Sequence, residues 1–298
     1  MAPEFSSDII KSMFSGNPIL KMVKRYNIKS NSIKIPAVDE TSRADGSRHG
    51  GVQAYYIAEA GEKTASRPKF RQLELSLNKL VVLVYTTDEL LEDAGTLGAY
   101  LGEIAPDEIG FRAQDAIING SGAGQPLGIV NSGALVSVSK ESGQAADTVV
   151  FENIVKMYQR MPGRNRANAV WVCNQDVEAQ LFSMSLSVGS GGGPVYLTAG
   201  GASAAPFATL MGRPVIPTEQ CPTLGDAGDI MFCDFSQYIM ATRGNIQADM
   251  SIHVRYVYDE SVFRFVYRFD GQPVLDSPVT PFKGSNTLGP FVALAERA

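Results

Sequence analysis

The sequence predicts an α+β fold, in which helices and antiparallel strands occupy separate stretches of the chain. Apolar residues spaced three and four apart, at Ile109, Ala113 and Ile117, indicate a helix with one buried face. Alternating apolar and polar residues over 70–79 and again over 249–270 indicate long strands. The two periodicities together indicate that the chain contains both helices and strands.

Composition is that of a globular protein of one large or two ordinary domains. The chain has 298 residues, of which 44% are hydrophobic and 19% charged. No apolar run is long enough to span a membrane. Its formal net charge of −5 gives little overall attraction for nucleic acid. Cys173, Cys221 and Cys233 lack the spacing of a metal site, and we interpret them as reduced thiols of a cytoplasmic protein.

The N-terminal stretch, residues 1–32, mixes Ser, Asn and Lys with scattered apolar residues and predicts an extended arm. Its basic side chains outnumber its acidic ones, so it could touch DNA or an acidic neighbouring subunit. A solvated, mobile terminus is the alternative. Residues 32–38 alternate briefly, like a short strand, and 39–51 form a polar loop.

A long hairpin is predicted next. Residues 52–60 are expected to form one strand, 61–68 a charged turn, and 70–87 a second extended run. The first half of that run alternates, with leucines on one side. Its second half, 80–85, is continuously apolar, which predicts that both faces are covered.

The length of the second run suggests that the hairpin reaches a second copy of the chain. At ~3.3 Å per residue it would span roughly 55 Å, and a two-stranded ribbon of that length is not stable alone in water. We therefore expect the apolar stripe and the neighbouring cations to contact another subunit. These residues are Lys63, Arg67, Lys69, Arg71, Leu73, Leu75 and Leu77.

Two helices should follow the hairpin. Residues 88–94 carry acidic residues in their first turn and end at Gly95. The next helix presents Leu97, Tyr100 and Ile104 on one face and continues into the segment around Ile109. Pro106 lacks an amide hydrogen and crowds the preceding turn, so a kink or a break is predicted there.

A glycine-rich segment ends this helix. Asn119 and Gly120 favour the left-handed conformations that close a helix C-terminus. A phosphate-binding loop is a poor interpretation, because the glycines end a helix rather than begin one and no Lys-Ser or Lys-Thr pair follows. We expect a sharp junction, and a hinge between two domains, at Gly120, Gly122, Gly124, Pro126 and Gly128.

The remainder alternates short strands and helices. The predicted elements are a strand at 134–140, a helix at 151–161, a buried strand at 168–174, a helix at 176–182, a flexible glycine-rich region at 189–206, apolar runs at 210–217 and 229–236, and paired strands with one buried face over 250–269. The last segment, 283–298, has no clear pattern.

The residue pattern from Asp115 to Gly120 and from Gln125 to Ile129 resembles the end of the long spine helix in major capsid proteins of tailed phages. Other motifs recur there in the same order: a helix before Pro-Gly, an Asn-Ala-x-Trp strand, a Leu-x-Gly-x-Pro-Val turn and an apolar run ending in Asp-Phe-Ser. The resemblance covers roughly residues 85–275.

This resemblance implies the phage major capsid fold. Its parts would be an N-terminal arm (1–32), a peripheral-domain strand and loop (33–51), an extended-loop hairpin (52–79), the peripheral domain with its spine helix (80–120), an axial domain (121–245), returning peripheral strands (246–282) and a C-terminal tail (283–298). In this family the extended loop lies across a neighbouring subunit.

The implied function is a structural subunit that assembles through pentamers and hexamers into an icosahedral shell around double-stranded DNA. Expected partners are other copies, the packaged DNA bound non-specifically, a portal protein, and a scaffolding protein or protease, with no membrane. Assembly would take place in the host cytoplasm and end in the virion capsid. An encapsulin-like compartment and, remotely, a soluble hydrolase are the alternatives.

We expect no catalytic residues, cofactor or metal. The chain has two histidines, His49 in a polar loop and His253 on a predicted strand, and neither accompanies a Gly-x-Ser-x-Gly motif. Some members of the family join a lysine of the extended loop to an asparagine of a neighbour, assisted by a glutamate. Here 263–275 contains neither residue type, so we predict no such isopeptide cross-link.

Overall fold

The computed structural model describes residues 16–87, 89, 97–188, 191–194, 196 and 209–297. It contains both helices and strands, which confirms the α+β class. The chain divides into two compact units. The first comprises Met1–Lys34, Glu74–Gly128 and Tyr238–Gln272, and the second comprises Ile35–Leu73, Ile129–Gln237 and Pro273–Ala298.

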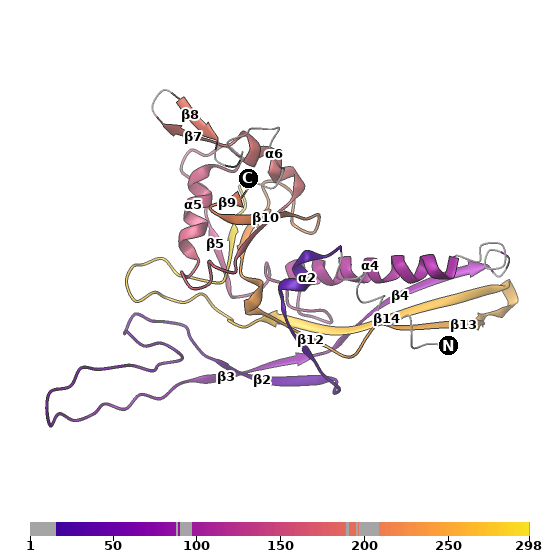
Figure 1. The fold of residues 1–298 in the computed structure, drawn as a ribbon, viewed down its shortest axis with the longest axis horizontal. Coiled ribbons are helices and arrows are strands. Elements are labelled where there is room, and N and C mark those ends of the chain that lie inside the picture. Colours follow the sequence, from indigo (N-terminus) through magenta and orange to yellow (C-terminus); the bar gives the residue numbers. More distant parts are fainter. Residues whose placement is uncertain are drawn as a thin grey trace. The chain divides into compact units, whose positions relative to one another are not determined.

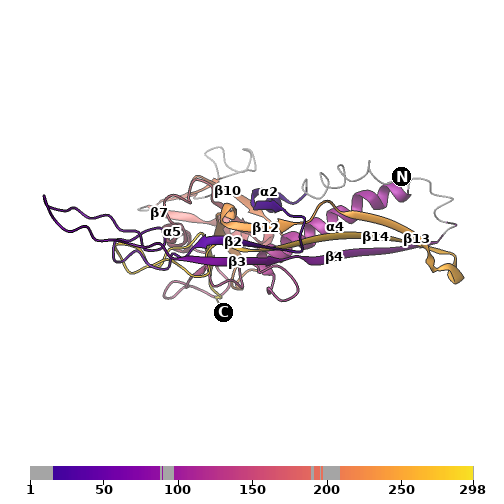
Figure 2. The same cartoon turned by 90° about the horizontal axis from the view of Figure 1, so that it is seen from below.

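The first unit is built on a five-stranded sheet of order β1-β12-β14-β13, in which β4 also pairs with β14. Figures 1 and 2 show β4, β13 and β14 running side by side, with helix α4 along them. Its elements are α2 (Pro18–Met22), β1 (Lys24–Asn27), β4 (Asn78–Thr87), α4 (Leu97–Asn119), β12 (Tyr238–Thr242), β13 (Gln247–Arg255), the 3-10 turn η3 (Tyr256–Tyr258) and β14 (Glu260–Pro273).

Helix α4 confirms the strongest helical prediction. Ile109, Ala113 and Ile117 are completely buried, as their spacing predicts. The helix runs unbroken for 23 residues through Pro106, so the expected break is wrong, and the alternative, a kink, stays a prediction. Pro106 is itself buried. Packing of the apolar face therefore outweighs the lost hydrogen bond and the ring clash of a proline inside a helix, which together cost about 3 kcal/mol.

The strands of the first unit are paired as predicted, but they are covered less than predicted. Strand β14 keeps Phe265 and Phe269 buried. In β4, however, Val81 and Leu83 are 43% and 47% exposed, so the apolar run does not have both faces covered. In β13 no residue is buried, although one buried face was expected. In the single chain, this part of the sheet has open apolar surface.

The second unit contains a six-stranded sheet of order β5-β15-β11-β6-β10-β9. Trp171 lies completely buried in it, stacks on Phe232 at 4.3 Å between ring centroids, and donates its indole N–H to the Leu210 carbonyl. Helix α5 packs against β5 and β15. The elements are β5 (Leu135–Val138), α5 (Phe151–Arg160), β6 (Val170–Cys173), α6 (Gln175–Ser183), β9 (Thr209–Leu210), β10 (Arg213–Pro217), β11 (Ile230–Cys233), the 3-10 turn η2 (Phe235–Gln237) and β15 (Phe291–Leu294), with β7 (Ser185–Val188) paired to β8 (Gly191–Pro194).

These elements confirm the helix predicted at 151–161, the helix at 176–182 and the buried strand at 168–174. The C-terminal segment, for which no element was predicted, supplies β15, which lies inside the sheet between β5 and β11. The helix expected at 88–94 and most of the glycine-rich region at 189–206 lie outside the described residues.

A separate two-stranded sheet pairs β2 (Ser32–Val38) with β3 (Phe70–Ser76). The strand expected at 52–60 is wrong, because that stretch is irregular apart from an isolated bridge at Val52. A strand needs a neighbouring backbone to pair with, and β3 pairs with β2 instead. The hairpin therefore consists of a short paired base and an irregular loop, residues 39–69.

Candidate assembly surfaces

The 39–69 loop is a highly exposed segment of the described part of the second unit. Every residue from 54 to 65 is exposed, and none belongs to a helix or strand. The base of the loop is held by backbone hydrogen bonds, from the Lys69 amide to the Gly50 carbonyl at 2.8 Å and from the Asp39 amide to the Lys69 carbonyl at 3.0 Å. The base of the loop is therefore fixed to its own chain, while the rest of the loop is free to contact another molecule.

Gly50 is required at this clamp. Its φ of +78° is a left-handed conformation that side chains rarely adopt. A Cβ atom there would lie 2.5 Å from the Lys69 carbonyl oxygen, closer than real contacts allow. The two backbones can therefore approach only at a glycine.

The cations predicted to contact a neighbour divide into two groups. Lys63, Arg67 and Lys69 are exposed on the 39–69 loop. Arg71, in contrast, forms an ion pair with Asp276 at 3.1 Å and donates to the Val274 carbonyl oxygen, both in its own unit. Arg71 therefore already binds groups of its own chain, whereas Lys63, Arg67 and Lys69 are available to a partner.

The leucine stripe is buried, contrary to the expectation from its alternation. Leu73, Leu75 and Leu77 are 2%, 1% and 8% exposed, so the single chain already covers them. They do not need a second copy, and the inter-subunit contact predicted from them is wrong. The segment that lacks cover is the loop before them, where Tyr56 is fully exposed and Tyr55 and Ile57 are 49% and 44% exposed.

The glycine-rich segment after α4 forms a tight closed loop in the first unit. Gly128 donates its amide to the Gly120 carbonyl at 2.8 Å, and Gly122 donates to the Pro126 carbonyl at 3.1 Å. A Cβ on Gly120 would lie 2.2 Å from the Pro126 carbonyl oxygen, and one on Gly128 would lie 2.4 Å from the Gly120 amide nitrogen. Gly122 and Gly124 have φ of +79° and +70°, so this loop depends on glycine.

The same loop is fixed to the returning strands. Leu127 donates its amide to the Gly271 carbonyl at 2.8 Å, and the Tyr238 hydroxyl donates to the Leu127 carbonyl at 2.9 Å. The Glu74–Gly128 stretch of the first unit ends directly after this attachment. The predicted hinge at Gly120–Gly128 stays a prediction.

An open cleft of about 520 Å³ lies beside this loop and is lined by Glu74, Ser76, Asn78, Ser121, Gly122, Gly124, Gln125, Leu127, Asp270, Gly271 and Gln272. Asp270 accepts hydrogen bonds from the Ser76 and Gly271 amides at 2.8 and 2.9 Å. Burial nevertheless raises the pKa of its carboxyl. The lining is polar and suits hydrogen bonding to a peptide or side chain.

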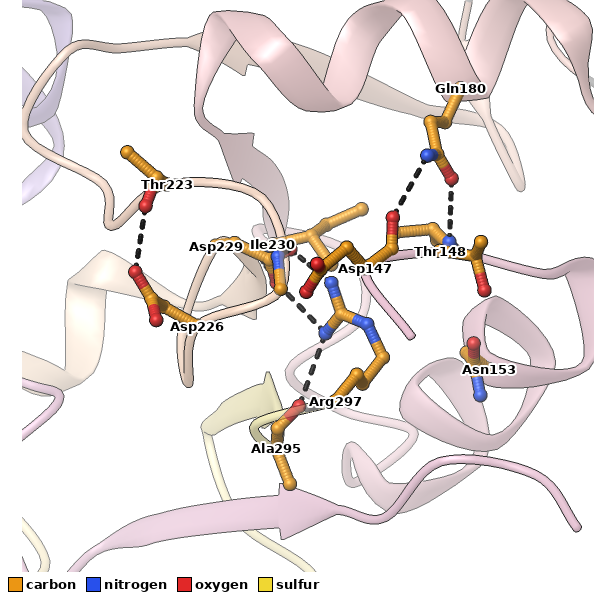
Figure 3. A network of polar contacts seen from close by, with 12 residues as sticks. Asp147, Thr148, Asn153, Gln180, Thr223, Asp226, Asp229, Ile230, Ala295 and Arg297 are labelled. Atoms are coloured by element: carbon orange, nitrogen blue, oxygen red, sulfur yellow. Dashed lines mark hydrogen bonds and ion pairs between the residues drawn. The ribbon is translucent and has the colours of Figure 1, made fainter. Parts of the chain in front are cut away.

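A buried network of polar contacts surrounds Arg297, near the C-terminus of the chain (Figure 3). Arg297 and Asp229 form a bidentate ion pair in which both side chains are completely buried. The Arg297 amide donates to the Gly225 carbonyl at 2.8 Å, and its carbonyl accepts from the Asp147 amide at 3.1 Å. No local pattern in the sequence predicts this pair, because its two residues lie 68 positions apart.

The histidine and cysteine side chains, which could act in catalysis or bind a metal, lie on separate elements or are buried. His49 lies on the 39–69 loop and His253 on β13, both exposed. The three thiols are free and buried, and burial raises the pKa of each. Within the described ranges no cluster of three or more His, Cys, Asp or Glu side chains could hold a metal ion. No helix in those ranges is both long and apolar enough to cross a membrane.

Solved structures with the same fold define the class of protein. The capsid of a native GTA particle aligns with a TM-score of 0.73 at 19% identity, covering 94% of this chain and 90% of that chain. A structure from Microbacterium phage Oxtober96 aligns at 0.68 and 14% identity, covering 94% and 91%. A virus-like particle from Pyrococcus furiosus aligns at 0.57 and 11%, covering 98% of each chain. The architecture is therefore the phage major capsid fold.

A sequence model of the phage capsid family matches residues 1–284. No curated protein matches the chain. The chain belongs to the phage capsid family, and it is a structural major capsid subunit of the kind that self-assembles into an icosahedral shell, the virion capsid.

Proposed function

We propose that this chain forms the shell of a tailed phage or prophage and encloses double-stranded DNA. Pentamers and hexamers would be its intermediates, assembled in the host cytoplasm with a portal protein and with a separate scaffolding protein or a protease. The first unit, with α4, corresponds to the peripheral domain of the family, and the sheet around Trp171 corresponds to the axial domain.

The observation that carries this proposal is the unsupported 39–69 loop. Its exposed aromatic residues and its cations Lys63, Arg67 and Lys69 have no cover in the single chain. A loop of this kind gains stability when it lies on a neighbouring subunit. In a closed shell many weak contacts of this type form at once, and together they stabilise the assembly.

The glycine loop after α4 supplies the second part of the mechanism. Gly120, Gly122, Gly124, Pro126 and Gly128 separate the segment that carries α4 from the chain that enters the second sheet. Small backbone adjustments at this junction would let one sequence occupy both five-fold and six-fold positions. The modest net charge of −5 also suits a wall along which DNA must slide.

Negative-stain electron microscopy of the purified protein tests the shell directly. We expect closed shells, or pentamers and hexamers, and a monomeric or dimeric particle under all assembly conditions would contradict the proposal. The content of shells isolated from cells distinguishes the alternatives. Nuclease-protected double-stranded DNA would support a phage capsid, whereas an enclosed enzyme with no DNA would indicate an encapsulin-like compartment.

A further inference from the structure

One face of the first unit's sheet carries a row of cations across three strands. Arg268 on β14 lies opposite Lys79 on β4, and the Arg243 amide, just beyond β12, donates to the Arg268 carbonyl at 3.1 Å. Arg243 and Arg268 line a cleft of about 150 Å³ together with Asn245, Gln247 and Val266. The lining holds two guanidinium groups and two side-chain amides, and it holds no carboxylate.

The two arginines are the unusual feature of this cleft. Neither forms an ion pair with any residue in the described part of the chain. Arg268 is half-buried, and a partly desolvated cation is stabilised when an anion reaches it. The next row contrasts with this one, because Arg264 is paired with Asp249 at 2.6 Å. The cleft is thus a place for an anionic group supplied from outside the chain.

Apolar residues continue the same face. Side chains alternate along a strand, so Lys79, Val81 and Leu83 of β4 project to one side. Val81 and Leu83 lie opposite Val266 and Arg264 of β14 and are 43% and 47% exposed. A surface that combines arginine with exposed aliphatic side chains has the composition of a protein interface. A site for nucleic-acid phosphate alone would need the cations and not the apolar neighbours.

The 39–69 loop has the complementary character. Tyr55, Tyr56 and Ile57 are exposed, and Glu59 and Glu62 follow them within a few residues. No ion pair involves either glutamate in the described part of the chain. The loop therefore offers apolar side chains next to two free carboxylates, and the sheet face offers apolar side chains next to two free guanidinium groups.

We propose that Glu59 and Glu62 of one copy enter the Arg243–Arg268 cleft of a second copy, while Tyr55, Tyr56 and Ile57 cover Val81 and Leu83. This inference rests on the proposed function, because it names the surface on which the loop of a neighbouring subunit is seated. The desolvated charge pairs would fix the register of the loop, and the apolar contacts would supply area.

A charge-exchange experiment tests the pairing. The variants E59R/E62R and R243E/R268E should each lower the yield of shells or capsomers at least about tenfold, because like charges would then face each other. The combined quadruple variant should recover to within about threefold of the wild type, since the charges are complementary again. K29E/K283E reverses two exposed cations elsewhere and is the matched control. Yields are measured by sedimentation velocity, after circular dichroism has shown that each subunit is folded.

The outcomes separate this inference from the proposed function. If the wild type does not assemble, the proposed function fails. If the wild type assembles but the quadruple variant recovers no better than its parents, the pairing is wrong. The pairing is also overturned if E59R/E62R assembles normally while R243E/R268E loses binding of a short DNA duplex by unassembled subunits, because the cleft would then be a phosphate site.

Discussion

Arg297 and Asp229 are the clearest case of a single pair on which the second unit depends. Both side chains are completely buried, and the carboxylate also accepts the amides of Gly225 and Ile230 at 3.1 and 2.8 Å. A buried charge costs several kcal/mol in lost hydration, which its partner offsets only when the geometry is good. Here the pairing is bidentate, so removing one partner leaves the other buried and unpaired.

We therefore expect Arg297→Ala to lower the free energy of unfolding of the unassembled subunit by about 3–5 kcal/mol. The measurement is urea unfolding followed by Trp171 fluorescence, since that side chain is buried in the same unit. The double variant D229A/R297M should be less destabilised than R297A, because it leaves no unpaired charge. A loss below about 1 kcal/mol for R297A would show that water reaches this site.

The buried thiols give a second prediction at this scale. Burial, with the nearby carboxylates of Glu178 and Asp229, raises the pKa of the Cys173 thiol to about 12. Burial likewise raises the pKa of Cys221 and Cys233. Because the thiolate is the reactive form, native subunits at pH 8 should react negligibly with a thiol reagent such as DTNB. All three cysteines should react after unfolding in urea. Rapid labelling of the native subunit would mean that its sheet opens readily.

At the scale of the element, two glycines connected with α4 have opposite roles. Gly102 lies inside the helix, and a Cβ atom added there would meet no other atom within 4 Å, so its backbone freedom is only a cost. Gly120 ends the helix where any Cβ would meet a carbonyl oxygen. The same substitution should therefore have opposite effects at the two positions.

We expect Gly102→Ala to stabilise the unassembled subunit by about 0.5–1 kcal/mol. Gly120→Ala should destabilise it by about 1–3 kcal/mol through overpacking. Thermal unfolding of the two variants beside the wild type measures both effects. An equal effect of the two substitutions would contradict the role assigned to the glycine loop.

The elements also show where prediction from sequence succeeds. Apolar spacing predicted the buried face of α4, and alternation predicted β3 and β14, because these patterns arise from burial within the chain. A continuous apolar run predicted β4, and alternation predicted β13, although no residue of β13 is buried in the single chain. Strand β15 was missed, because an apolar run as short as Phe291–Leu294 indicates burial without distinguishing a strand from a helix. The 52–60 strand was wrongly predicted because its composition suits a strand while no neighbouring backbone pairs with it.

The candidate sites were less predictable than the elements. Burial of Leu73, Leu75 and Leu77 depends on how distant segments meet, so alternation indicated the stripe without indicating what covers it. The cleft at Arg243 and Arg268 depends on the register of three strands, which no local pattern in the sequence determines.

On the scale of the whole molecule, the subunit exposes more large apolar side chains than a monomer needs. Many of them lie on β4, on β13 with η3, and on the 39–69 loop, and they include Tyr256, Val257 and Tyr258 at 73%, 90% and 71% exposure. Large exposed apolar patches mark interaction surfaces. An assembling shell accounts for them together, since each copy can cover the surfaces of its neighbours.

The remaining question at this scale is whether the shell is joined covalently or only by such contacts. An isopeptide cross-link of the family's kind would need an exposed lysine such as Lys63 or Lys69 on the loop and an asparagine with an assisting glutamate on the neighbour. Residues 263–275 contain neither Asn nor Glu. The strength of the shell must then come from ion pairs and apolar burial, both of which are lost in detergent.

Boiled in sodium dodecyl sulfate, intact shells should therefore run as a single band at the mass of one subunit. Shells of K63R/K69R should give the same pattern, since no lysine is consumed. A ladder of multiples in the wild type that disappears in K63R/K69R would contradict the prediction. In that event Asn78 would be the acceptor to test, because it lines the same polar cleft as Asp270, whose pKa is raised by burial. The Asn78→Asp variant should then abolish the ladder as well.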